Sequence, residues 1–217
     1  DSVVSRIEEG IRSASLLPLS TVFGLFPRMV RDLAIAQDKE LTLDIQGADT
    51  TVDKGIIEQL KDPLMHLIRN SADHGVESPD DREAAGKPRA GNITLRASQS
   101  ATVVTIEVID DGRGISSDAV GRKAVERGLV SADDLELMSD EEVNALVFAA
   151  GFSTSTVITD LSGRGVGLDV VRTAIEDLRG AVALHSTPGE GSVFRIDLPV
   201  PLATSRVLVA RVARIFA

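Results

Sequence analysis

The stretch HLIRNSADHG (66–75) places two histidines, an asparagine and an aspartate within one short segment. Such side chains bind metal ions, accept phosphoryl groups, hold ligands or simply face water. At 100° per residue, six polar side chains fall in one arc of a helix and five apolar ones fall mostly opposite. The polar set is Gln59, Asp62, His66, Asn70, Asp73 and His74, and the apolar set is Ile57, Leu60, Leu64, Leu67 and Ile68. Polar stripes usually face solvent, but this one is rich in short, ligand-capable side chains.

The stripe favours magnesium over zinc. His66 and Asn70 stand four residues apart, but no third His or Cys lies nearby and the zinc motif H-E-x-x-H is not matched. The Asn70 amide offers a hard oxygen, and Mg²⁺ prefers few protein oxygens together with phosphates and water. Asn70 is therefore a candidate Mg²⁺ ligand, provided that a phosphate-binding loop faces it.

Three glycine-rich turns punctuate the chain: DDGRG (110–114), GRGVG (163–167) and TPGEGS (187–192). Glycine allows positive φ and a close approach of the backbone to a ligand. The second turn opens onto a predicted helix at 168–178, whose free N–H groups can bind an anion. It follows a long loop rather than a strand, and no P-loop motif is present, so neither standard nucleotide fingerprint is met. We expect phosphates to bind at residues 163–168.

Asp110 continues the inward-facing register of Val104, Ile106 and Val108 in a predicted strand. A carboxylate at such a position is costly unless it is hydrogen-bonded. It either caps the turn at Gly112 or accepts a donor from a ligand. An exocyclic amine such as adenine N6 suits this acceptor, whereas guanine presents an acceptor there. An unmet polar group costs about 1–3 kcal/mol, which is enough for a useful base preference.

The elements that must position these residues are mixed helices and strands. Residues 1–36 read as helical with an interruption near LLPLS, and residues 54–75 form a helix that runs through Pro63 or restarts there with Asp62 as its cap. Residues 76–91 form a polar excursion. Strands are predicted at 41–45, 92–98, 102–109, 181–186 and 192–199, and further helices at 117–127, 140–148 and 168–178. Hairpin-linked strands with packed helices predict an α+β fold with one sheet and helices on one face.

Composition excludes several classes of function. The 217 residues carry a net charge of −10 and contain no Trp or Tyr, which argues against a nucleic-acid-binding surface. No Cys is present, so there is no disulfide framework, and no apolar run is long enough for membrane insertion. These features favour a soluble cytoplasmic protein. The start lacks both Met and a signal pattern, and we infer a piece of a longer protein.

In this order, the motifs resemble those of the ATP-binding domain shared by sensor histidine kinases, gyrase, Hsp90 and MutL. The chemotaxis-type histidine kinases (CheA) are the most similar branch. HLIRNSADHG resembles their N box, DDGRGI, SGRGVGLDVVR and TPGEGSVFRIDLP their Gly boxes, and GFSTS their lid segment. The resemblance covers roughly residues 17–200. It implies a Bergerat-type two-layer α/β sandwich with a mixed, mostly antiparallel sheet.

The resemblance also implies a role for each matching residue. Asn70 would bind Mg²⁺, His66 would assist the acceptor or the γ-phosphate, and His74 would lie beside the triphosphate. Asp110 would receive adenine N6, with Gly112, Gly114 and Ser192 around the base. Phosphates and the lid would involve Lys123, Ser153, Thr154, Gly163, Arg164, Gly165, Val166, Gly167 and Leu168. ATP and Mg²⁺ are the implied cofactors.

The implied activity is transfer of the ATP γ-phosphoryl group to a histidine on a separate phosphotransfer domain. Residues 1–36 would be a helical connector from an upstream dimerisation domain, 37–200 the catalytic domain, and 201–217 a linker and the first strand of a CheW-like regulatory domain. The implied partners are the phosphotransfer domain, a CheW-like coupling protein with a receptor array, and a response regulator. The full-length protein would be a homodimer.

Two departures from the family pattern keep other functions open. The family often carries lysines where this chain has Ala119 and Ser155, and a cation on a transferring phosphoryl group matters greatly for rate. A nucleotide-gated interaction module with weak or no kinase activity is therefore the alternative. An ATPase of the gyrase or MutL type is a third hypothesis, but the stripe lacks the usual catalytic Glu of that class.

Overall fold

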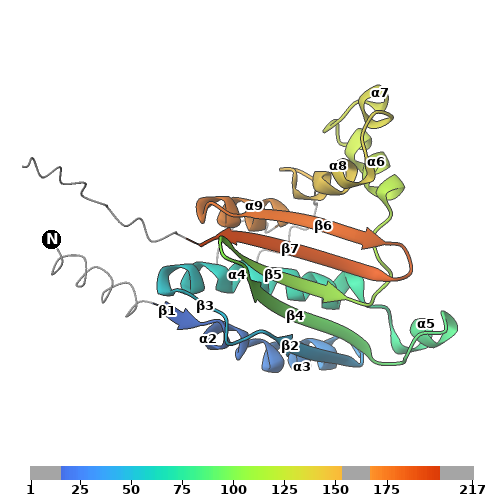
Figure 1. Cartoon of the computed structure of the whole chain (residues 1–217). Coiled ribbons are helices and arrows are strands. Elements are labelled where there is room, and N and C mark those ends of the chain that lie inside the picture. The colour runs from blue at the N-terminus through green and yellow to red at the C-terminus, as the bar shows by residue number, and fades with distance from the viewer. Residues whose placement is uncertain (1–15, 153–166, 201–217) are drawn as a thin grey trace, which may run out of the picture.

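The protein is built around a five-stranded sheet, seen in a computed structural model that describes residues 16–152 and 167–200 (Figure 1). The strand order is β2-β4-β5-β7-β6. The bounds are β2 Leu41–Gln46, β4 Gly91–Gln99, β5 Val103–Asp110, β6 Ala181–Thr187 and β7 Gly191–Pro199. β2 pairs parallel with β4, and the other neighbours pair antiparallel. The predicted mixed, mostly antiparallel sheet is confirmed.

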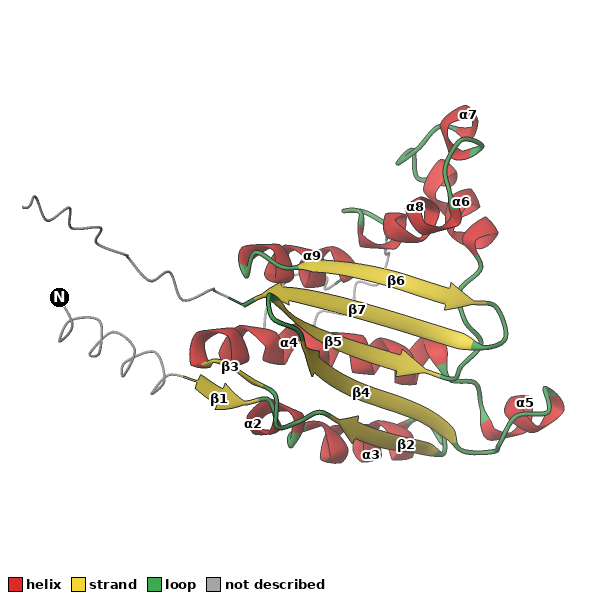
Figure 2. Cartoon of the chain, in the orientation of Figure 1, coloured by secondary structure: helices red, strands yellow, loops and turns green. Residues whose placement is uncertain are grey.

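Helices cover one face of this sheet and leave the other face open (Figure 2). The covering helices are α2 Ser20–Phe23, α3 Phe26–Ala36, α4 Lys54–Asn70 and α9 Leu168–Asp177. Along β5, alternate residues are buried, and the buried set is the predicted one: Val104, Ile106, Val108 and Asp110. The apolar side chains of α4 pack into the same core. Alternation in the strands and the apolar face of α4 together produce the predicted α+β sandwich.

Helix α4 runs unbroken through Pro63, so the predicted alternative of a restart at Asp62 is wrong. The helix begins after Asp53, whose carboxylate accepts a hydrogen bond of 2.8 Å from the Gly55 N–H. Pro63 is buried on the packed side of α4, and we attribute its tolerance to the burial of this side of the helix, which outweighs the missing N–H. The α-helix ends at Asn70 and continues as a π-helix, η1 (Ser71–Gly75), so the 100° periodicity does not extend to His74.

Several short elements were not predicted. β1 (Leu16–Pro18) pairs antiparallel with β3 (Thr51–Asp53), and α5 (Pro79–Ala84) lies within the polar excursion. Between β5 and α9, α7 (Ala132–Leu135) is also new, whereas α6 (Ser117–Glu126) and α8 (Asp140–Ala145) with the 3₁₀ turn η2 (Leu146–Phe148) correspond to the predicted helices at 117–127 and 140–148. In the expected connector, Val22, Phe23 and Phe26 belong to the main core. No helix within 16–152 or 167–200 combines the length and apolar content needed to cross a bilayer.

Candidate functional site

Asp110 is a buried carboxylate at the carboxyl end of β5, with 3% of its surface exposed. Its Oδ1 accepts the Gly112 N–H at 3.1 Å, and its Oδ2 accepts the Ser71 hydroxyl at 3.0 Å. Burial raises the pKa of Asp110, and the hydrogen bonds from Gly112 and Ser71 offset this only in part. A carboxylate can accept about four hydrogen bonds, so Asp110 caps its turn and retains capacity for a ligand donor.

Glycines allow the surrounding segments to approach this carboxylate. A Cβ on Gly75 would lie 3.1 Å from the Asp110 carboxyl group, and a Cβ on Gly112 would lie 2.1 Å from the Gly75 carbonyl oxygen. Gly114 has a φ of +66°, and its Cβ would lie 2.2 Å from the Thr187 carbonyl oxygen. The N box and the first and third glycine turns therefore converge on Asp110, as the resemblance implies.

Ser192 lies beside Asp110, because the two residues are register partners in the β5–β7 pairing. Its hydroxyl is buried and lies 3.0 Å from the Ser186 hydroxyl. Ser186 in turn donates to the Gly191 carbonyl and accepts the Ile115 N–H at 2.8 Å. These two hydroxyls tie the third glycine turn to the segment that follows the first.

The stripe of α4 and η1 contributes three predicted residues. His66 and Asn70 are half-buried on α4, and His74 is exposed on η1. Within the described residues, the Asn70 amide has no hydrogen-bond partner, so its oxygen is free for a ligand. No group of three His, Cys, Asp or Glu suited to a metal occurs in the described part of the chain. A single amide oxygen fits Mg²⁺ held mainly by phosphates and water.

His66 lies in an environment that disfavours its charged form. Burial lowers the pKa of the imidazole, and the positive charge of Arg69 lowers it further, against smaller opposing effects of Asp169 and Asp73. Asp169 belongs to the first turn of α9, so the His66 region of α4 and the start of α9 lie close together. At neutral pH, His66 is therefore a neutral hydrogen-bonding group rather than a cation.

The described end of the second glycine turn leads into α9. Gly167 is the N-cap of the helix, and Leu168 begins it and packs partly buried against the core. Helix α9, which these residues begin, packs against α4. Ser153, Thr154, Gly163, Arg164, Gly165 and Val166 lie outside the described residues.

Residues 59–202 match the family described as histidine kinase-, DNA gyrase B- and HSP90-like ATPase. The chain belongs to this ATPase family. The match includes the N box and all three glycine turns, so the predicted family and fold are confirmed. The geometry around Asp110 is thus that of a member of the ATPase family.

Relatives in the ATPase family include chemotaxis proteins. The chain is 45% identical to the chemotaxis protein CheA of Halobacterium salinarum over 96% of its length, and 45% identical to that of Bacillus subtilis over 93%. It is 43% identical to a gliding motility regulatory protein of Myxococcus xanthus over 96% of its length. The chain spans 31%, 30% and 27% of these three relatives, or about a third or less.

A solved structure shows the same fold. The catalytic domain of histidine kinase ThkA superposes with a TM-score of 0.53 at 18% identity, over 85% of this chain and 93% of that one. The two-layer arrangement is therefore shared with the ThkA catalytic domain.

Lys123 lies on α6, a helix separate from the elements around Asp110. Its ammonium group sits over the ring of Phe152, 4.9 Å from the ring centroid, a favourable cation–π distance. Arg127, one turn later, donates hydrogen bonds to the carbonyl oxygens of Gly151 and Phe152. Helix α6 thus holds the last described residues before position 153.

Several supporting residues escaped prediction. Ser71 lies between polar and apolar faces of the helix, so periodicity alone did not single it out.

Lys39 donates all three ammonium protons to carbonyl oxygens of η1 and the following residue: Ala72 at 2.6 Å, Asp73 at 3.1 Å and Val76 at 2.8 Å. Gln37 donates to the Asp73 carboxylate. For these residues the sequence gives no signal. For α5 it does, because the S-P-D-D sequence at Ser78 is typical of a helix start.

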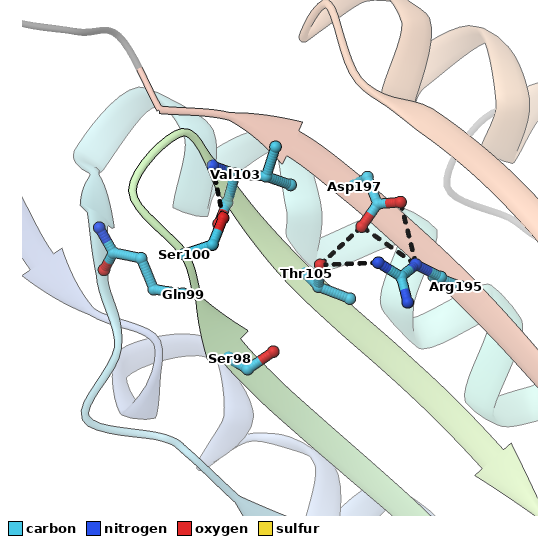
Figure 3. Close-up of a pocket in the computed structure, with 7 residues that line it drawn as sticks. All are labelled: Ser98, Gln99, Ser100, Val103, Thr105, Arg195 and Asp197. Carbon is cyan, nitrogen blue, oxygen red and sulfur yellow. Dashed lines mark hydrogen bonds and ion pairs between the residues drawn. The ribbon is translucent and has the colours of Figure 1, made fainter.

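A hollow of about 460 Å³ on the open face of the sheet is not part of this site (Figure 3). It is lined by residues of β4, β5, β7 and the turn between β4 and β5: Ser98, Gln99, Ser100, Val103, Thr105, Arg195 and Asp197. Asp197 accepts hydrogen bonds from Thr105 at 2.6 Å and from Arg195 at 3.0 Å. These polar side chains satisfy one another across the strands, and no predicted site residue lines the hollow.

The low pKa expected for His66 can be measured directly. In an NMR titration of the histidine side chains, we expect the His66 midpoint below the ordinary value of about 6.5. Arg69→Gln should move the midpoint upward, because it removes a neighbouring positive charge and leaves the burial of His66 unchanged. A His66 midpoint at or above the ordinary value, or one insensitive to Arg69→Gln, would contradict this description.

Proposed function

We propose that this chain is the ATP-binding catalytic domain of a chemotaxis-type histidine kinase, which transfers the ATP γ-phosphoryl group to a histidine on a separate phosphotransfer domain. The main support is the convergence of the N box on Asp110, through the Ser71 hydrogen bond and the approach of Gly75 to Gly112. The similarity to CheA proteins along nearly the whole chain supports the same activity.

Adenine would be recognised by the buried carboxylate. Asp110 would accept the N6 amine, while Gly112 and Gly114 shape the pocket and Ser192 lies by the base. Gly75 leaves room at the carboxylate that any side chain would fill. The base is thereby held in a dry site, where a missing hydrogen bond is costly.

The triphosphate would lie along the stripe of α4. Asn70 would hold Mg²⁺, which when bound neutralises phosphate charge, and His74 would lie beside the phosphates. Gly163, Arg164, Gly165, Val166, Gly167 and Leu168 would wrap the phosphates, with Lys123 reaching toward them and Ser153 and Thr154 on the lid. Neutral His66 would hydrogen-bond the γ-phosphate or accept the proton that leaves the acceptor imidazole. The P–O bond to ADP breaks as the new P–N bond forms.

The complete protein would extend this chain. Residues 1–36 would connect it to an upstream dimerisation domain and residues 201–217 to a CheW-like domain, in a cytoplasmic homodimer. A CheW-like coupling protein would link it to a receptor array, and a response regulator would receive the phosphoryl group. The similarity to CheA proteins is the support for these proposed partners.

The kinase proposal predicts a labelled histidine on the acceptor domain. The chain is incubated with γ-labelled ATP, Mg²⁺ and a CheA-type phosphotransfer domain, and we expect acid-labile label on that domain. The same domain with its acceptor His replaced by Gln serves as the control and should stay unlabelled. ATP binding without transfer would overturn the kinase assignment.

The second candidate is a nucleotide-gated interaction module. Ala119 is exposed on α6, one turn before Lys123, at a position where the family often carries a cation. Lys123 of the same helix contacts Phe152, so this cation engages the chain leading to position 153. Nucleotide binding with no transfer in the assay above would favour this function, whereas hydrolysis without any acceptor would favour an ATPase.

A further inference from the structure

The polar segment between η1 and β4, residues 76–90, is partly buried. Helix α5 lies beyond the carboxyl end of β5, next to the start of β4 (Figure 1). Its Arg82 is 1% exposed, which makes it the largest fully buried side chain among the described residues. A buried guanidinium is tolerated only when its charge and its N–H groups are matched.

All five N–H groups of Arg82 have partners. Nη2 donates to Asp111 Oδ2 at 2.8 Å and Nη1 to Asp111 Oδ1 at 3.1 Å, which is a two-pronged contact with one carboxylate. Nη1 also donates to Glu77 at 3.2 Å. Nε and Nη2 donate to the carbonyl oxygens of Pro88 at 2.7 Å and Ala90 at 3.3 Å. Arg82 therefore joins the segment after the N box to the turn that follows Asp110.

Lys87, on the same segment as Arg82, also contacts the turn at Asp111 and Gly112. Its ammonium donates to the Asp111 carbonyl at 3.0 Å, the Gly112 carbonyl at 2.6 Å and Glu77 at 2.9 Å. Asp111 also accepts the Asn92 N–H at 2.9 Å. Arg82 and Lys87, which both pair with Glu77, therefore fix the backbone of residues 111 and 112 together with the start of β4.

The placement of this turn determines where the Asp110 carboxylate points. The Gly112 N–H is one of its donors, and Gly112 lies so close to Gly75 that a Cβ would meet the Gly75 carbonyl oxygen at 2.1 Å. The Arg113 N–H donates to the same Gly75 carbonyl at 2.9 Å. A shift of the turn would therefore move both the carboxylate and the wall of the pocket.

We propose that Arg82 is a positioning residue for adenine recognition, which acts through Asp111 to hold the Asp110–Gly112 turn against Gly75. The proposal rests on the proposed function, because it assigns the base pocket of that same site. Arg82 does not touch the nucleotide. It sets base selectivity by fixing the acceptor that reads the base.

The test measures base discrimination. ATP and inosine triphosphate, which lacks the N6 amine, compete with a fluorescent adenine nucleotide for the full chain. Arg82→Lys keeps the charge but loses the two-pronged contact. We expect ATP affinity to fall about tenfold, because a displaced carboxylate weakens its hydrogen bond to the N6 amine, with inosine triphosphate affinity nearly unchanged. The ratio of the two affinities should fall with it.

Two controls separate positioning from a merely structural role. Arg89→Lys changes an exposed arginine of the same segment, which pairs with Glu40, Asp80 and Glu83, and should leave the ratio unchanged. In an Asp110→Asn background, Arg82→Lys should have no further effect on the ratio. Lys87→Met, which removes the contact with the Gly112 carbonyl, should also lower the ratio. It is the variant to measure if Arg82→Lys fails to fold.

The outcomes are distinct. Reduced stability of Arg82→Lys with an unchanged ratio of ATP to inosine triphosphate affinity in the folded protein would overturn the positioning role. If Arg82→Lys does not fold and Lys87→Met is measured instead, an unchanged ratio for Lys87→Met would overturn it as well. An equal loss for both nucleotides would also overturn it. Failure of the unaltered chain to bind ATP would overturn the proposed function together with this inference. ATP binding without phosphoryl transfer would overturn the kinase activity alone.

Discussion

Asp110→Asn should weaken ATP binding by an order of magnitude or more while the fold stays intact. The carboxylate is buried, and its replacement removes a charged acceptor for the adenine amine. Hydrogen bonds to charged groups contribute about 1.5–3 kcal/mol, equivalent to roughly a tenfold to hundredfold change in affinity. The chain has no Trp or Tyr, so displacement of a fluorescent nucleotide is the practical measurement.

The stability of the same variant provides its control. Burial raises the folded-state pKa of Asp110, so the folded protein disfavours the ionised form. This penalty is fully present above the folded-state pKa, shrinks as the pH falls below it, and is gone below the ordinary pKa of the unfolded chain. Asparagine carries no charge and can still accept the Gly112 N–H and bond to Ser71. We therefore expect the free energy of unfolding at pH 7 to be equal or higher in the variant, and unchanged nucleotide affinity would remove Asp110 from the pocket.

Asn70→Ala should abolish the Mg²⁺ dependence of nucleotide binding. The Asn70 amide has no hydrogen-bond partner among the described residues, so its removal should cost little stability. In the unaltered chain, adding Mg²⁺ should strengthen ATP binding and chelation should reverse this. In the variant the two conditions should give similar affinities. Phosphoryl transfer should fall by about a hundredfold or more, the usual effect of losing one charge-stabilising group.

Gln59→Ala is the matched control for this prediction. Gln59 lies on the same stripe of α4 and is exposed, and among the described residues it donates only to the Gly55 carbonyl of its own helix. It should leave both the Mg²⁺ dependence and the transfer rate unchanged. If Asn70→Ala still binds ATP more tightly with Mg²⁺ than without it, another residue holds the metal.

The fold and the heart of the site follow from local patterns in the sequence. Alternation in β5 predicted that Asp110 points inward with Val104, Ile106 and Val108, and all four are buried. The apolar residues of α4 predicted which of its faces packs on the sheet. These predictions succeed because a strand or helix needs only its own periodicity to define a face.

The supports of the site could not be predicted in this way. The contact of Arg82 with Asp111 joins residues on different elements, and no local period encodes it. Residues 76–91 were predicted as a polar excursion, because nothing in the sequence marks any one of their charged side chains as buried. The π turn of η1 also breaks the 100° rule at the end of the N box, where it brings Gly75 to Gly112. Long-range ion pairs and irregular helices depend on tertiary packing rather than on spacing.

The strand order has a consequence for synthesis. Among the described strands, β7 comes last in the chain, yet it lies between β5 and β6. Until β7 leaves the ribosome, the β4–β5 hairpin presents an open edge on β5, the strand with a buried apolar row. Open edges of this kind pair readily with other chains. The nascent protein therefore carries this open edge throughout the translation of α6 to α9, and we expect protection by chaperones to matter in that interval.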